Sequence, residues 1–148
     1  MHFVVCVDGS EQSDRALEHA ADLVDATDGS LTVVHVVEPK VYEQAGEGPI
    51  STRSEGEKSL VLEGIEDAEN RGEEVLEEAR EAVPFEVEDV LLYGDADDAI
   101  AQYVETREGI DGVIVGHRMV SERRREMLGS VARGLIELSP VPVTVVRE

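Results

Sequence analysis

Short runs of apolar residues alternate along the chain with segments whose apolar residues recur at helical spacing. The first run, Phe3 to Val7, ends at Asp8-Gly9-Ser10. A segment with helical spacing follows, and Asp28-Gly29 breaks it. The second run, Leu31 to Val37, is rich in β-branched residues and does not alternate with polar ones. Such a run is expected for a strand buried on both faces, so the chain opens as strand, helix, strand.

The rest of the chain repeats this alternation and adds two long segments without periodicity. Residues 38–57 contain Pro39, Gly46, Gly48 and Pro49 with little apolar periodicity and predict a long mobile loop. An acid-rich helix follows to about Val83, and Pro84 stops it. Residues 116–128 predict a second, glycine-bounded loop. The remaining elements expected are strands over 87–92, 112–115 and 141–146, a helix that opens after Gly94-Asp95 and ends at Gly109, and a helix over 131–138.

Alternating strands and helices indicate the fold class. Right-handed crossovers between such strands build an open parallel sheet with helices on both faces. We therefore expect a single α/β domain over residues 1–148 with a five-stranded, Rossmann-like sheet. In open sheets of this kind, ligands bind beyond the carboxyl ends of the strands, where the strand order reverses. The loops after the first and fourth strands are the places to look for a site.

Charge narrows the function classes. The chain has 34 acidic and 13 basic residues and a formal net charge of -21. Such a chain repels phosphate backbones and anionic lipids, which argues against nonspecific binding to nucleic acid or membranes. The acids are spread along the sequence instead of forming a tail, and this distribution favours an acidic, halophilic protein whose self-repulsion is screened by salt. The aromatic content is only 3%, so the core is aliphatic.

The compartment follows from the single cysteine and from the hydropathy. Cys6 lies in the first apolar run and cannot form a disulfide within one chain. The amino terminus has no basic segment followed by a long apolar stretch, and no window resembles a spanning helix. We therefore expect a cytoplasmic protein.

Two stretches carry candidate chemistry. Asp8-Gly9-Ser10 ends the first strand, where Asp8 can accept from a ligand or lie beside a metal-bound phosphate. The competing interpretation is that Asp8 and Ser10 only satisfy free N–H groups of the next helix. Gly116, followed after twelve residues by Gly129-Ser130-Val131, joins a strand end to a helix start whose free amides attract phosphate. Here the alternative is that both glycines serve only as turn and helix boundary.

Arginines and histidines near these stretches are ambiguous. Arg118 and three arginines at 123–125 lie within eight positions and suit an anion, but Glu122 and Glu126 allow a salt-bridged surface instead. His35 and His117 have no partner at metal-ligand spacing, so both are interpreted as packing or loop residues. The sequence has no Walker-type phosphate loop, no nucleophile elbow and no dinucleotide glycine motif.

Taken together, these segments resemble the universal stress protein family over almost the whole chain. The resemblance rests on Val7-Asp8-Gly9-Ser10, His35-Val36-Val37, Gly94-Asp95, Val115-Gly116, Gly129-Ser130-Val131 and the closing Pro140 to Val146. Family members that bind ATP use Gly-x-x-Gly, nine residues, then Gly-Ser or Gly-Thr. This frame fits at Gly116, 119, Gly129 and Ser130, with Met119 in place of the second glycine.

The resemblance implies a set of site residues and a partner. Asp8 is expected near the nucleotide and its magnesium ion, and the Val36 main chain is expected to meet adenine. Gly116, Gly129, Ser130 and Val131 are expected around ribose and phosphates, with Arg118 compensating for the β-carbon of Met119. The family's last strand commonly pairs with that of a second copy, so the resemblance also implies a homodimer through Val141 to Val146.

Two functions stay open on this basis. The first is a nucleotide-binding stress-response module that holds ATP with magnesium and hydrolyses it slowly at most. The second is a homodimeric interaction module that has lost tight ATP binding through Met119. A receiver domain is disfavoured because no lysine follows Lys58, and an adenylating ligase is disfavoured because its glycine-rich phosphate loop is missing.

Overall fold

The structure is organised around one parallel sheet. A computed structural model describes residues 1–38, 55–117 and 128–147. The sheet has the order β3-β2-β1-β4-β5, and every neighbouring pair of strands is parallel. The strands are β1 (His2–Cys6), β2 (Ser30–Val37), β3 (Glu88–Tyr93), β4 (Gly112–Gly116) and β5 (Val143–Val146), and the helices are α1 (Glu11–Thr27), α3 (Glu55–Ala82), α4 (Ala96–Thr106) and α5 (Ser130–Leu138). The predicted α/β fold with a five-stranded parallel sheet is confirmed.

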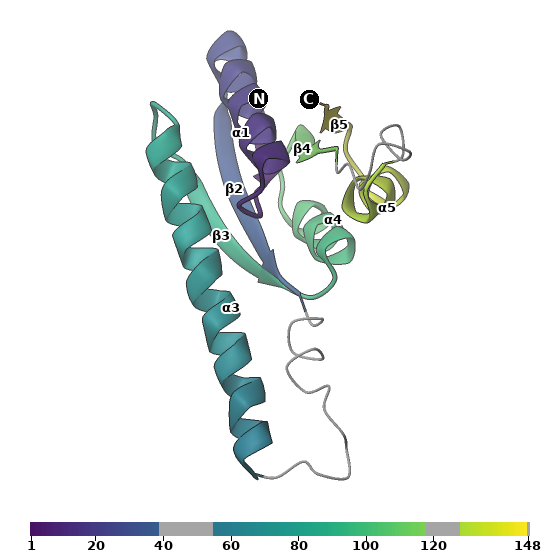
Figure 1. Cartoon of the computed structure of the whole chain (residues 1–148). Coiled ribbons are helices and arrows are strands. Elements are labelled where there is room, and N and C mark those ends of the chain that lie inside the picture. The colour runs from purple at the N-terminus through teal and green to yellow at the C-terminus, as the bar shows by residue number, and fades with distance from the viewer. Residues whose placement is uncertain (39–54, 118–127, 148) are drawn as a thin grey trace.

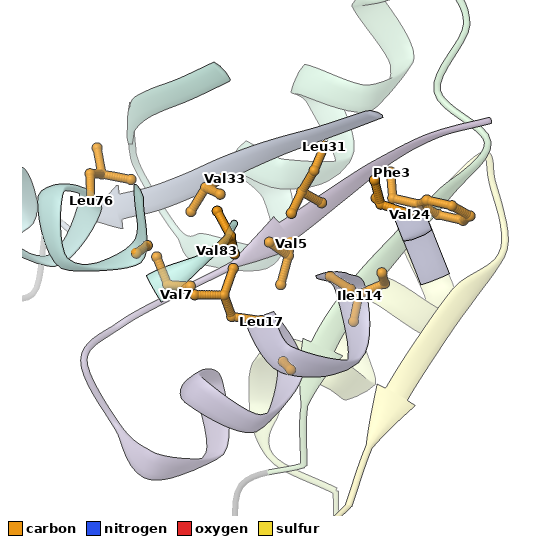
Figure 2. Close-up of a cluster of buried hydrophobic side chains, with 13 residues drawn as sticks. Phe3, Val5, Val7, Leu17, Val24, Leu31, Val33, Leu76, Val83 and Ile114 are labelled. Atoms are coloured by element: carbon orange, nitrogen blue, oxygen red, sulfur yellow. The ribbon is translucent and has the colours of Figure 1, made fainter. Parts of the chain in front are cut away.

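Helices cover both faces of the sheet (Figure 1). On one face, α1 and α3 pack over alternate strand residues such as Val5, Val33 and Ile114. Figure 2 shows this cluster, in which the side chains of two helices and three strands meet. On the other face, α4 and α5 pack over the intervening residues, among them Val4 and Val113. Burial on both faces explains why the strand sequences are continuous apolar runs.

Several element boundaries differ from those expected. Residues 55–57, expected in the loop over 38–57, belong to α3, and residues 39–54 lie outside the described part of the chain. The last strand begins at Val143 and not at 141, since Pro142 has no N–H to donate to the ladder. α4 ends at Thr106 instead of Gly109, and the Thr106 hydroxyl donates to the carbonyl of Gln102 at 3.0 Å in its last turn.

None of the helices in the described ranges combines the length and the apolarity that crossing a bilayer requires.

Candidate functional site

The strand order reverses between β1 and β4, and a pocket lies at their carboxyl ends. This is the position that the sequence predicted, after the first and fourth strands. The pocket lies among residues of β1, α1, β4 and α5. Its lining comprises Cys6, Asp8, Ser10, Gln12, Ser13, Val115, Gly116, Gly129, Val131 and Ala132.

The turn from β1 to α1 is held by hydrogen bonds among Asp8, Ser10 and Ser13. The Ser10 N–H donates to Asp8 Oδ1 at 2.9 Å, and the Asp8 N–H donates to Ser13 Oγ at 3.1 Å. Ser10 is the N-cap of α1, and its hydroxyl accepts from the Ser13 N–H at 3.2 Å. Gly9 allows the turn because its φ of 83° lies in the left-handed region. Ser10 therefore caps α1, and Asp8 accepts from the N–H of the N-cap residue while it also lies exposed in the pocket wall.

Gly116 ends β4 where the first turn of α1 crosses it. A β-carbon at residue 116 would lie 2.7 Å from the main-chain oxygen of Gln12 and 2.9 Å from its carbonyl carbon. The glycine is therefore required for close packing of main chain on main chain. Gln12 lines the pocket, and its Oε1 atom is buried without a hydrogen-bond partner within the described residues. Sequence reasoning missed Gln12, because only the crossing of α1 over β4 brings it to the site.

The amino end of α5 forms the opposite wall. Gly129 is its N-cap, buried and extended at φ -65° and ψ 161°, and it provides no side-chain cap. The Gly129 carbonyl accepts from the Arg133 N–H at 3.0 Å. Ser130 is exposed, while Val131 is half-buried and lines the pocket. Two helix amino ends, those of α1 and α5, thus border the same pocket, and the partial positive charge of both favours an anion there.

Two expected site residues within the described ranges, Val36 and Ser130, do not line the pocket. Val36 lies near the carboxyl end of β2, paired in register with Leu92 of β3, and it is buried in the apolar cluster on the face that α4 and α5 cover. Arg118 lies outside the described residues, as do Met119 and the three arginines at 123–125. The predicted phosphate loop over 116–129 is accordingly described only at its two ends.

Cys6 contributes a thiol to the floor of the pocket. The side chain is half-buried, and it packs with the apolar cluster under α4 and α5. Burial raises the pKa of the thiol from 9.0 to about 12, with further contributions from the negative charges of Asp8 and Glu38. The thiol therefore stays protonated at neutral pH and is a poor nucleophile.

The two histidines differ in their surroundings. His35 of β2 lies under α3, and its Nδ1 atom lies 2.8 Å from the main-chain oxygen of Val7. His117 follows β4 and is buried, and its main-chain N–H donates to the carbonyl of Val146 at 2.8 Å. Its Nε2 atom has no hydrogen-bond partner among the residues described. His35 is therefore packed under α3 and also hydrogen-bonded to the end of β1. The described ranges contain no group of three or more His, Cys, Asp or Glu residues that could hold a metal ion.

The comparisons with known proteins agree with one another. The model of the universal stress protein family matches residues 1–147. A universal stress protein of Bacillus subtilis, YxiE, is 28% identical over 147 residues, which cover 97% of this chain and 97% of the relative. UspA of Lactobacillus plantarum superposes with a TM-score of 0.77 at 17% identity, covering 99% of this chain and 97% of that one. A universal stress protein of Archaeoglobus fulgidus in complex with dAMP gives 0.61 at 24% identity, with coverages of 98% and 96%. These two structural likenesses show a shared fold.

Proposed function

This chain belongs to the universal stress protein family, and from that premise we propose that it binds an adenine nucleotide, ATP with magnesium, in the pocket between β1 and β4. The observation that carries the proposal is the meeting of two helix amino ends at the carboxyl edge of the sheet. Ser10, Gln12 and Ser13 bring the first turn of α1 to the pocket, and Gly129 and Val131 bring that of α5. Main-chain N–H groups at such ends favour phosphate even in a protein of net charge -21.

The phosphates are assigned to the α5 side of the pocket. Gly129 has no side-chain cap, and the exposed hydroxyl of Ser130 can donate to a phosphate oxygen. Gly116 and Val131 line the same pocket and are assigned to ribose and phosphate contacts. We also assign Arg118 to the phosphates on the strength of its charge and position in the sequence.

The residues present fit a magnesium ion that arrives with the nucleotide. Magnesium is typically held by one or two carboxylates together with phosphate oxygens and water. Asp8 is the one carboxylate among the described residues that line the pocket. When bound, the ion would neutralise phosphate charge beside Asp8. Because this part of the wall provides no second acid or base, we expect slow hydrolysis at most.

Isothermal titration of ATP with magnesium in molar potassium chloride tests the proposal, with Ser130→Ala and Met119→Gly variants. We expect micromolar binding by the parent chain and weaker binding by Ser130→Ala. Binding by Met119→Gly alone would instead support an interaction module that has lost tight ATP binding. If none of the three proteins bound ATP while their secondary structure was intact, nucleotide binding would be refuted.

We also propose a homodimer through the carboxyl-terminal strand. β5 is the edge strand of the sheet, and the bond from the His117 N–H to the Val146 carbonyl directs its even-numbered residues toward β4. The main-chain groups of Val143 and Val145 therefore face outward, where a second strand can pair. The apolar side chains of Ile136 and Leu138 on nearby α5 are 53% and 48% exposed, which supports an adjoining contact.

Light scattering after size exclusion in high salt measures the assembly. Val145→Pro removes an outward N–H and is expected to convert the dimer to a monomer, whereas Thr144→Val leaves the outward groups unchanged. A monomeric parent chain would refute the dimer.

A further inference from the structure

The hydrogen-bond ladder between β1 and β2 ends at a side chain. The Val7 N–H donates to the Val34 carbonyl at 2.9 Å and continues the register that pairs Cys6 with Val34. In a parallel ladder, the next bond would run from the Val36 N–H to the Val7 carbonyl. Within the described residues that bond is not formed, and the Val7 carbonyl instead meets His35 Nδ1 at 2.8 Å. Because a carbonyl only accepts, Nδ1 carries the proton and donates.

The position of the imidazole is fixed by the helix above it. Gly72 of α3 lies over His35, and a β-carbon at residue 72 would lie 2.7 Å from His35 Cδ2. The same β-carbon would lie 2.8 Å from Leu91 Cδ1 on the adjacent strand. α3 therefore has no side chain at this point, and the ring lies between helix and sheet with its Nδ1 directed at the end of β1.

The consequence concerns the main chain of Val36. Alternate residues of a strand direct their N–H and C=O groups to the same side, so Val36 directs its pair toward β1 as Val34 does. β1 ends at Cys6, and the ladder stops one step before Val36. Val36 as a whole is only 8% exposed, and its side chain packs on the far face, so the residue is anchored while its main-chain edge faces the end of β1.

We infer that His35 is a positioning residue for recognition of the base. By occupying the Val7 carbonyl, its imidazole ends the β1–β2 ladder and leaves the Val36 N–H and C=O for a planar heteroaromatic base. Adenine offers an acceptor nitrogen beside an amino donor, which matches one donor and one acceptor of a strand edge, whereas guanine presents donor and acceptor in the reverse order. This inference rests on the proposed function and on the contact between the Val36 main chain and adenine that the family resemblance implies. What it adds is His35 as the residue that keeps this strand edge unpaired.

Two variants separate the hydrogen bond from the packing of the ring. His35→Leu keeps an apolar side chain of similar size under α3 and removes the donor. The Val7 carbonyl is then available to the Val36 N–H, and the ladder gains one bond. His35→Asn is the matched control, because its Nδ2 atom can donate to Val7 from nearly the same position.

Amide hydrogen exchange measured by NMR without nucleotide reports the ladder directly. We expect the Val36 amide to exchange about tenfold or more faster than the Val34 amide in the parent chain and in His35→Asn. In His35→Leu the two rates should become similar. Equal protection of Val34 and Val36 in the parent chain would overturn the inference, whatever the protein binds.

Titrations report the consequence for binding. His35→Leu is expected to weaken ATP about tenfold, the order expected for losing a main-chain pair. It should leave inorganic tripolyphosphate unchanged, and His35→Asn should bind ATP like the parent chain. Equal losses for ATP and tripolyphosphate, or an unchanged ATP affinity, would overturn the role of His35. If the parent chain bound no ATP, the proposed nucleotide function would fail, while the Val36 exchange rates would still decide whether His35 ends the ladder.

Discussion

Replacing Gly116 by alanine tests how the α1–β4 crossing builds the pocket. The new β-carbon would lie 2.7 Å from the Gln12 carbonyl oxygen and 2.9 Å from its carbonyl carbon, both main-chain atoms of α1. Carbon contacts are favourable at about 3.5–4.0 Å, so the first turn of α1 must move by several tenths of an ångström or more. Gly116 does not need a left-handed φ, so the effect is one of crowding alone.

The expected loss of stability follows from two opposing terms. Overpacking against main chain costs about 1–3 kcal/mol, because helix backbone cannot change rotamer to make room. Alanine also reduces the conformational freedom of the unfolded chain and returns about 0.4–1 kcal/mol. The crowding term is larger, and we expect a net loss of about 1–2 kcal/mol in the free energy of unfolding, measured by urea unfolding in high salt.

Binding distinguishes this variant from a merely destabilised one. A shifted α1 moves Gln12, Ser10 and Asp8 relative to α5, and we expect ATP to bind about tenfold more weakly. The matched control is Gly109→Ala, where φ is 85° and no atom lies within 4 Å of the new β-carbon. Gly109 precedes β4 at its amino end, whereas the pocket lies at the carboxyl end. An alanine forced into this left-handed φ should cost about 1–2 kcal/mol of stability and leave the affinity for ATP unchanged. A Gly116→Ala protein as stable and as tightly binding as the parent would refute this reasoning.

Three further predictions concern a serine pair, the thiol and salt. Ser10→Ala removes the N-cap of α1 and should lower the free energy of unfolding in urea by about 1 kcal/mol. Ser130 is exposed at the start of α5, so Ser130→Ala should weaken ATP binding with little loss of stability. The reverse pattern would contradict both roles. Cys6 should react slowly with iodoacetamide at pH 8, about tenfold faster per pH unit up to its pKa of about 12, and a plateau near pH 9 would exclude the raised pKa. Because the pKa of the thiol is about 12 in the folded protein and 9.0 in the unfolded chain, the free energy of unfolding should fall as the pH rises from 9.0 toward 12. Cys6→Val should reduce that fall. Raising potassium chloride from about 0.1 M to about 2 M should increase the free energy of unfolding as charge repulsion is screened, and an unchanged unfolding midpoint would refute the halophilic interpretation.

The strand and helix types could be predicted from the sequence because each depends on local pattern. β1 and β2 are almost continuous apolar runs rich in β-branched residues, which are typical of strands buried on both faces. Their boundaries were less certain, since residues 55–57 continue α3 and β5 begins only after Pro142. Helix ends depend on capping and on contacts with other elements, which the pattern of apolar positions does not encode.

The sequence by itself determined the edge of the sheet at which a site can lie and the residue types found there. Of the expected site residues, Asp8, Gly116, Gly129 and Val131 line the pocket, because strand ends and helix starts are local features, whereas the described Ser130 does not. Only the tertiary structure decided that Gln12 crosses Gly116 and that His35 reaches the Val7 carbonyl. Both contacts join segments distant in the chain, and their geometry follows from how α1 and α3 pack on the sheet. A single sequence constrains that packing only through the sum of many weak contacts.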